Sequence, residues 1–256
     1  MTENSVDESK TIKAEPTKEF FIDTLTKDIP LIQIIPDLVD NCIDGALRLR
    51  GNNSNFNGLW VAIKISTKEF YITDNCGGFD WELAKEYAFR FGRPSTMTPV
   101  PHSVGQFGVG MKRAIFKVGS RVRIESASNH SRFVISENVS EWKKKQEWTF
   151  TFAELETNLN IPIQDRGTSI KVWELHEGVS RNFDLENFRN RVKLELESKH
   201  RENMSKGLSI SLNGIPLQVR TLELLQSENI KPAYRELHLS EYPDVSIKIS
   251  VGIADS

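Results

Sequence analysis

The residues best suited to chemistry lie between positions 36 and 44, in the order Pro-Asp-Leu-Val-Asp-Asn-Cys-Ile-Asp. On a helix, with about 100° between successive residues, Asp37, Asp40, Asn41 and Asp44 share one narrow face, and apolar side chains fill the rest of the circumference. Asp and Asn are poor helix formers, so this stripe differs from an ordinary solvated face. Three carboxylates around one amide indicate a site that needs hard oxygen ligands. The alternative is an amphipathic helix with a short acidic surface.

A helix that carries these residues must be mostly buried, so its polar stripe is expected to line a cleft. Pro36 lacks an amide donor and crowds the preceding turn, which predicts either a kink at this residue or a helix that starts there. Residues 17–28 read as a short helix or strap that leads into this element. Residues 1–16 carry almost no apolar side chains and are expected to be a disordered tail.

A second polar group follows two strand-like runs at residues 59–65 and 70–73. Asp74 stands at the end of the second run and is followed by Asn-Cys-Gly-Gly. A carboxylate with small residues after it lets a flat ligand reach the backbone without meeting a side chain. The alternative is a plain loop in which Asp74 makes an Asx turn.

The third group is glycine-rich and opens a predicted helix, with the sequence Gly105-Gln106-Phe107-Gly108-Val109-Gly110. Bare amides at a helix N-terminus can bind phosphates, and Lys112 adds positive charge nearby. The spacing matches neither a P-loop nor the dinucleotide pattern G-x-G-x-x-G, so a tight turn is an equal alternative. Residues 92–104 contain three prolines and are expected to form a lid or a binding loop.

The rest of the chain reads as a mixture of helices and strands. We expect helices at 81–90 and 185–200, and strands at 121–125, 132–136, 148–152 and 167–172. The pair Asn213-Gly214 predicts a hairpin between residues 208–212 and 215–219. Residues 142–145, Trp-Lys-Lys-Lys, read as a solvated hairpin tip, and the alternating apolar residues at 245–253 read as a half-buried strand.

Composition narrows the class of protein. The charged fraction is 27% and the formal net charge is −2 over 256 residues. This charge gives no indication of a nucleic-acid partner, although such a partner is possible. The two cysteines show neither metal-ligand spacing nor a disulfide framework, which fits a reducing compartment. No apolar run approaches the ~20 residues of a membrane span, and the polar start is no signal peptide. We therefore expect a cytoplasmic protein without membrane contact.

Taken together, the motifs resemble the four nucleotide-binding boxes of the GHKL ATPases. That group comprises gyrase, the heat-shock chaperone ATPase, histidine kinases and MutL, with the MORC proteins close by. The boxes stand in the order Asp37-x-x-x-Asn41-x-x-Asp44, Asp74-x-Cys76-x-Gly78, Gly105-x-x-Gly108-x-Gly110 and Gly167-Thr168. The first is closest in style to MutL and MORC, and the third to the heat-shock chaperone.

This resemblance implies an α+β fold, the two-layer Bergerat-type α/β sandwich, with helices on one face of a mixed sheet and ATP between the helices and a lid. It also implies an ATP-binding domain at residues 17–180. A helix and the beginning of a second, transducer-like α/β domain would follow at residues 181–256.

The resemblance further implies a role for each motif residue. Asn41 would give its side-chain oxygen to Mg²⁺, whose other ligands are phosphates and waters. Asp74 would accept the adenine amino hydrogen, with Thr168 assisting, and Gly78 would leave room for the purine. The backbone amides of residues 105–110 would wrap the phosphates, and Lys112 would add charge.

Two residues depart from the family pattern. Asp37 stands where the family usually has a catalytic glutamate, and it is shorter by one methylene, or roughly 1.5 Å of reach. It would be the general base, acting slowly because a base must lie about 2.6–3.2 Å from its water. Cys76 replaces a glycine, which narrows the adenine site or changes the turn. Asp44 would support the pocket rather than touch the nucleotide.

The implied function is Mg²⁺-dependent binding and slow hydrolysis of ATP, which would drive lid closure and homodimerisation in a larger protein. Residues up to about 28 would then exchange between protomers. One alternative is a module that senses ATP or ADP with little or no hydrolysis. A histidine kinase ranks third, because no His-bearing dimerisation helix precedes the boxes and His200 lacks the family's acceptor pattern.

Overall fold

The computed structural model describes residues 16–51, 55–90, 110–219 and 224–253. The chain forms two compact units, with the boundary between Leu217 and Gln218. The predicted lid at 92–104 lies outside the described residues, as do residues 1–15 of the predicted tail. The expected domain division near residue 180 remains a prediction, although the helix and the Asn213-Gly214 hairpin that follow it belong to the first unit.

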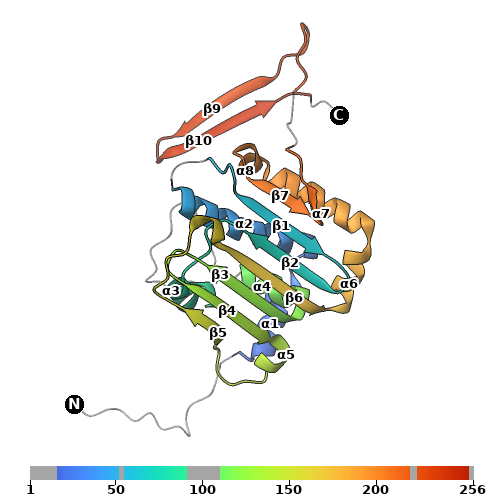
Figure 1. Ribbon diagram of the computed structural model, residues 1–256. Coiled ribbons are helices and arrows are strands. Elements are labelled where there is room, and N and C mark those ends of the chain that lie inside the picture. The colour runs from blue at the N-terminus through green and yellow to red at the C-terminus, as the bar shows by residue number, and fades with distance from the viewer. Residues whose placement is uncertain (1–15, 52–54, 91–109, 220–223, 254–256) are drawn as a thin grey trace, which may run out of the picture. The chain divides into compact units, whose positions relative to one another are not determined.

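The first unit is built on an eight-stranded mixed sheet with the strand order β5-β4-β3-β6-β2-β1-β7-β8 (Figure 1). Neighbouring strands are antiparallel except β1 and β7, which are parallel. The strands are β1 (Trp60–Ile65), β2 (Glu69–Asp74), β3 (Gly119–Ala127), β4 (Arg132–Asn138), β5 (Phe152–Glu156), β6 (Gly167–Leu175), β7 (Ser209–Leu212) and β8 (Ile215–Pro216).

Helices cover one face of this sheet, and α1, α2 and α4 lie behind it in the view of Figure 1. Their buried side chains and those of the central strands form one core. This arrangement confirms the predicted α+β sandwich. The helices are α1 (Lys18–Lys27), α2 (Leu31–Arg50), α3 (Trp81–Leu83), which continues into the π-helix η2 (Ala84–Ala88), α4 (Gly110–Val118), α5 (Val139–Trp142), the 3₁₀-helix η3 (Ile163–Asp165), α6 (Glu177–Asp184), α7 (Glu186–Lys199) and α8 (Arg201–Ser205).

Helix α2 is continuous from Leu31 to Arg50 and contains Pro36 in its interior. The alternative that the helix starts at Pro36 is therefore wrong, and the predicted kink is not tested. A proline inside a helix costs about 3 kcal/mol because it removes one backbone hydrogen bond. Ile34 and Ile35, just before Pro36, are fully buried, so packing of the first turns offsets that loss.

Trp142 is fully buried, so the prediction of a solvated tip was wrong for this residue. Its ring stacks on Phe150 with the ring centres 5.0 Å apart, and it also lies 5.9 Å from Phe116. Trp148 contacts the same ring edge-on. Because the aromatic residues at 148 and 150 pack on Trp142, strand β5 begins only at Phe152 and the predicted strand at 148–152 is displaced.

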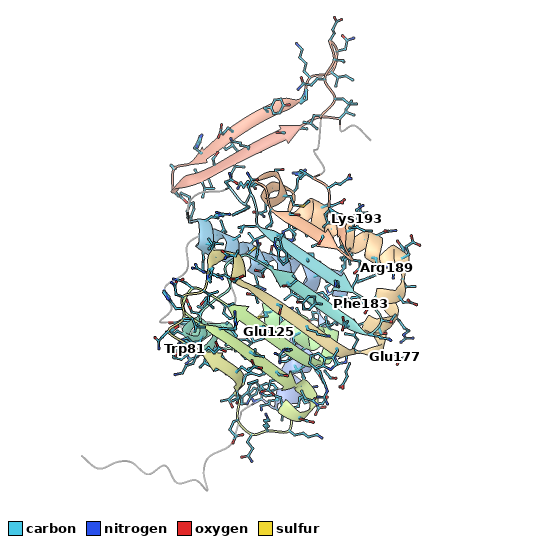
Figure 2. The ribbon with its side chains drawn as sticks, in the orientation of Figure 1. Trp81, Glu125, Glu177, Phe183, Arg189 and Lys193 are labelled. Carbon is cyan, nitrogen blue, oxygen red and sulfur yellow. The ribbon has the colours of Figure 1, made fainter. Side chains whose placement is uncertain are left out.

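The helix expected at 185–200 is present as α7, and Phe188, Val192 and Leu196 form its buried face. Leu185, which was expected to belong to the same apolar stripe, is instead the N-cap residue and is 57% exposed. Helix α7 packs against α2. Arg189 donates hydrogen bonds to the backbone oxygens of Phe183 and Asp184, both at 2.8 Å, and so closes the turn between α6 and α7 (Figure 2). This turn sets the direction in which α7 runs toward its last residue, Lys199.

The second unit contains an antiparallel pair of strands, β9 (Ala233–Leu239) and β10 (Tyr242–Val251). Strand β10 confirms the predicted strand, but Val245, Ile247 and Ile249 are 37–44% exposed within the described residues, so the expectation of a half-buried face was wrong. Two strands alone cannot cover an apolar face. None of the described helices is long and apolar enough to cross a membrane.

Candidate functional site

A cavity of about 320 Å³ lies between α2, the loop after β2, the first turn of α4 and the start of β6. It brings together residues that are far apart in the sequence. The predicted site residues that line it are Asp37, Asn41, Asp44, Asp74, Gly78, Gly110 and Thr168. Residues 105–109 of the glycine-rich loop lie outside the described residues, so their predicted contacts with phosphate stay a prediction.

The polar stripe of α2 faces this cavity, as its helical spacing predicted. The side-chain nitrogen of Asn41 donates a hydrogen bond to the backbone oxygen of Asp37, one turn earlier, at 3.1 Å. This bond uses the amide as a donor and leaves the side-chain oxygen as the atom available to a ligand. An oxygen donor of this kind fits Mg²⁺, which is a hard ion.

Lys199 reaches the same stripe from the end of α7. Its ammonium lies 3.1 Å from Oδ1 of Asp37 and 2.8 Å from Oδ2 of Asp40. Burial raises the pKa of Asp40, and the Lys199 ammonium offsets only part of that rise. Burial opposes protonation of Lys199, but its hydrogen bonds to Asp40 and Asp37 outweigh this effect and raise its pKa. The ammonium therefore stays charged between the two carboxylates.

His200 follows Lys199 and is buried against α2, with Nδ1 3.7 Å from Oδ1 of Asp40. Burial lowers the pKa of His200 to about 4, and the neighbouring Lys199 charge lowers it further, so the imidazole is neutral at pH 7. Neither residue was among the predicted site residues. Lys199 is 162 residues from Asp37 along the chain, and no local pattern signals a contact of that kind.

Asp74 ends strand β2 and is 8% exposed. Its Oδ1 accepts a hydrogen bond from the backbone amide of Cys76 at 2.7 Å. The Asx turn that was the alternative interpretation is thus present, and Asp74 lines the cavity as well. Burial raises the pKa of Asp74 to about 6, although hydrogen bonds from the Cys76 and Thr168 amides and the charge of Arg48 favour its ionised form. The carboxyl is ionised at pH 7.

Cys76 fits the turn after Asp74 without backbone strain. The left-handed positions are Gly77 (φ 92°) and Gly78 (φ 62°), and Cys76 itself is not among the described residues with positive φ. Whether Cys76 narrows the adenine site or changes the turn relative to the family stays a prediction. The Cys76 thiol is buried and lines the cavity, as does Cys42. Burial raises the pKa of both thiols, which keeps them protonated and unreactive.

Gly78 is required by a close backbone approach. A Cβ atom on Gly78 would lie 2.2 Å from the backbone oxygen of Ala127 and 3.0 Å from that of Gly167. Gly167 is equally confined, because its Cβ would lie 2.0 Å from the backbone oxygen of Asp74. The loop after β2 and the start of β6 therefore pack directly on each other, which places Thr168 beside Asp74.

Positive groups also reach the cavity. Arg48 and Arg113 line it, together with the first residue of α4, Gly110, whose helix end carries a partial positive charge. Burial lowers the pKa of Arg48, while Asp44 and Asp74 oppose that shift. Helical spacing places Arg48 on the polar face of α2, but neither Arg48 nor Arg113 was among the predicted site residues.

Lys112 is a buried residue of α4. It is 2% exposed, its ammonium donates a hydrogen bond to the backbone oxygen of Ala88 at 2.7 Å, and it is not among the residues that line the cavity. Burial lowers its pKa to about 8. The Lys112 side chain therefore connects α4 to the end of η2, and its predicted contribution to phosphate binding is not tested.

The arrangement of these motifs agrees with a comparison against protein families. Residues 31–168 match the family model of histidine kinase-, DNA gyrase B- and HSP90-like ATPases. The chain belongs to this family. A comparison with curated proteins finds no match to the chain.

Membership of these GHKL ATPases supports nucleotide binding by an ATPase domain in general. The matched segment begins at Leu31, the first residue of α2, and ends at Thr168, so it contains both the acidic stripe and Asp74. Lys199 and His200 lie beyond it. The contact between α7 and the acidic stripe is therefore a property of this chain that the match does not describe.

Proposed function

We propose that this chain binds ATP with Mg²⁺ in the cavity and hydrolyses it slowly. The observation that carries the proposal is the convergence of Asp37, Asn41, Asp74 and Thr168 on one cavity beside the N-terminal end of α4. Residues of the first, second and fourth boxes and Gly110 of the third, which are spread over most of the matched segment, line this one cavity. ADP would occupy the same site.

Each residue has a role that its surroundings support. Asp74 would accept a hydrogen bond from the adenine amino group through an ionised carboxylate, and Thr168 would assist with its hydroxyl. Asn41 would hold Mg²⁺ through its side-chain oxygen, and the ion when bound would neutralise phosphate charge. Arg48 and Arg113 would offset the charge that a triphosphate brings to a cavity lined by aspartates.

Asp37 would act as general base toward the attacking water. The water oxygen would form a bond to the γ-phosphorus while the bond from that phosphorus to the bridging β–γ oxygen breaks, and Asp37 would take the proton. Its short side chain supports slow turnover, because it reaches less far from the helix than the glutamate that is usual in the family. This feature also favours the second candidate function, a module that senses the nucleotide with little hydrolysis.

The wider mechanism that we propose is closure of residues 92–104 over the nucleotide, coupled to dimerisation of a larger protein. In the structure, α1 is docked on its own chain, with Ile22 buried and the Lys117 ammonium 2.8 Å from the backbone oxygen of Thr26. Exchange of residues up to 28 between protomers would have to break these contacts. Phosphotransfer to His200 is disfavoured because that side chain is 1% exposed.

Calorimetry and a steady-state ATPase assay would test the proposal, with Asn41→Ala as the control that removes the metal ligand. We expect the wild-type chain to bind ADP and ATP in a Mg²⁺-dependent manner and to turn over ATP faster than Asn41→Ala. Binding without any turnover above that control would support the sensing module. Light scattering with and without a non-hydrolysable ATP analogue tests dimerisation, and an unchanged monomer mass at saturating nucleotide would refute it.

A further inference from the structure

Lys199 joins two carboxylates that lie one turn apart on α2. Its ammonium is 3.1 Å from Oδ1 of Asp37 and 2.8 Å from Oδ2 of Asp40. The two carboxylates differ in burial, because the Asp40 side chain is 14% exposed and the Asp37 side chain is 35% exposed. The shorter contact is thus to the more buried carboxylate, which makes Asp40 the anchor of the ammonium and Asp37 its second, more mobile partner.

The backbone at Lys199 is also fixed. Lys199 is the last residue of α7, and the next amide, of His200, donates a hydrogen bond to the backbone oxygen of Leu196 at 3.0 Å. The His200 side chain is 1% exposed and lies against α2, and Leu196 is fully buried. A lysine at an exposed helix end would sample many conformations. The backbone of Lys199 is instead held in place by the buried side chains of Leu196 and His200.

An aspartate that serves as a base needs this restraint more than a glutamate does. Its carboxylate is close to the helix backbone and must lie about 2.6–3.2 Å from the attacking water. Without a partner, Asp37 would be repelled by Asp40 on the same face and would turn toward solvent. An ion pair through Oδ1 fixes the side-chain rotamer and leaves Oδ2 for the water.

We propose that Lys199 is a positioning residue for ATP hydrolysis, which holds the Asp37 carboxylate toward the cavity through an ion pair anchored on Asp40. This inference rests on the proposed function, since it requires that Asp37 accepts the proton of the attacking water. Lys199 itself contacts the base and takes no part in the transfer of the proton. It also lies outside the segment that matches the family, so it would be a feature that this chain adds to the common site.

The test compares Lys199→Met, Lys199→Arg and Lys206→Met. Methionine keeps most of the apolar stem and removes the charge, while arginine keeps the charge. Lys206 is the matched control, because its side chain is 37% exposed, against 38% for Lys199. Its ammonium lies 2.7 Å from Oε1 of Glu202, and neither residue lines the cavity. We expect Lys199→Met to lower kcat by about 10-fold to 100-fold with KM changed by less than about twofold. Lys199→Arg should recover part of this loss, and Lys206→Met should match the wild type.

A second comparison shows whether Lys199 acts through Asp37. If it does, Lys199→Met should have no further effect on the rate in an Asp37→Asn background, because the group that it positions is already lost. The same variants should bind a non-hydrolysable ATP analogue with wild-type affinity by calorimetry, and their circular dichroism spectra should match that of the wild type.

Several results would overturn the inference. An unchanged or increased kcat in Lys199→Met would show that the ion pair does not assist the base. An increase in KM alone would show that Lys199 contacts the nucleotide, and a full effect in the Asp37→Asn background would show that it acts elsewhere. If the wild type turns over no faster than Asp37→Asn, Asp37 is not the base and the positioning role is refuted. If the wild type binds nucleotide but turns over no faster than Asn41→Ala, hydrolysis itself is refuted. If only the results for the Lys199 variants differ from those expected, the positioning role is refuted and the proposal of ATP hydrolysis is unaffected.

Discussion

The Lys18 ammonium lies 4.1 Å from the centre of the Trp142 ring and donates a hydrogen bond to the Trp142 backbone oxygen at 2.9 Å. The same ammonium donates to the backbone oxygens of Lys145 and Glu147, at 2.8 Å and 2.6 Å. One side chain from α1 thus donates to three carbonyl groups, at the last residue of α5 and in the segment that follows it. Lys18 is only 5% exposed, and its bond to Trp142 is buried, whereas the other two bonds are partly buried.

We predict that Lys18→Met lowers the free energy of unfolding by about 2–4 kcal/mol, because it removes a cation–π contact and three hydrogen bonds from a charged donor. Lys27→Met, at the exposed last turn of the same helix, should change it by less than about 0.5 kcal/mol. Urea denaturation of the three proteins measures the difference. Equal stability of both variants would mean that α1 is not anchored by Lys18.

Asp74→Asn should strongly weaken nucleotide binding. An asparagine side chain can turn its amide donor toward the adenine amino group, and it lacks the acceptor strength of a carboxylate. We expect a loss of affinity for ADP with Mg²⁺ of about 10-fold or more, which corresponds to about 1.4 kcal/mol. Calorimetry measures this directly, and near wild-type affinity in the variant would refute the adenine assignment.

The raised pKa of Asp74 predicts opposite effects of pH on stability and on binding. A carboxyl whose pKa is about 6 when folded binds more protons in the folded than in the unfolded state. Its contribution to stability therefore increases as the pH falls through 6. Relative to Asp74→Asn, the nucleotide-free wild type should gain about 1 kcal/mol between pH 7.5 and pH 5.

Nucleotide affinity should fall over the same pH range, because the protonated carboxyl is a weaker acceptor. Denaturation curves and calorimetry at matched pH values measure the two trends. A stability difference that does not depend on pH would show that Asp74 keeps an ordinary pKa in the folded protein.

Asp37→Asn should preserve nucleotide binding and remove most hydrolysis, by about 10²-fold or more for a positioned base. Asp37→Glu tests the length of the side chain, since it restores the reach of the residue that is usual in the family. An ATPase assay under saturating nucleotide compares the three proteins. Equal turnover in the wild type and Asp37→Asn would show that another group activates the water.

Gly78→Ala should destabilise the protein by about 3 kcal/mol or more, because the position combines a left-handed backbone (φ 62°) with a Cβ 2.2 Å from the Ala127 oxygen. Gly178 is the matched control. A Cβ at Gly178 meets no described atom within 4 Å, and the residue lies in helix α6. Gly178→Ala should be neutral or stabilising by up to about 1 kcal/mol. Thermal unfolding of both variants separates the two cases.

Much of the site could be predicted from the sequence because its signals are local. The acidic stripe of α2 follows from helical spacing, and Asp74 follows from its place at the end of a strand. The role of Gly78 could not be derived in this way, since the glycine is required by Ala127, which belongs to a strand that is remote in the sequence. Local spacing also cannot show that Lys112 bonds to the backbone of Ala88.

Parts of the fold were harder to predict for a related reason. Three lysines after Trp142 indicate a solvated segment. The indole ring of Trp142 nevertheless has a large apolar surface, which packs against Phe150 and Phe116. Those partners come from other elements, as does the ammonium of Lys18. Long-range packing of this kind overrides the local charge pattern, and it also displaced the start of β5 to Phe152.

Strand β6 pairs with β3 on one side and with β2 on the other, and the family match ends at Thr168, the second residue of this strand. A polypeptide cut at the end of the match would therefore lack the strand that joins the two halves of the sheet. Each half would present a row of unpaired backbone groups, which favours aggregation. The segment that matches the family is thus shorter than the segment needed to complete the sheet. The boundaries of an expressed fragment should therefore follow the pairing of the strands and not the ends of the motifs.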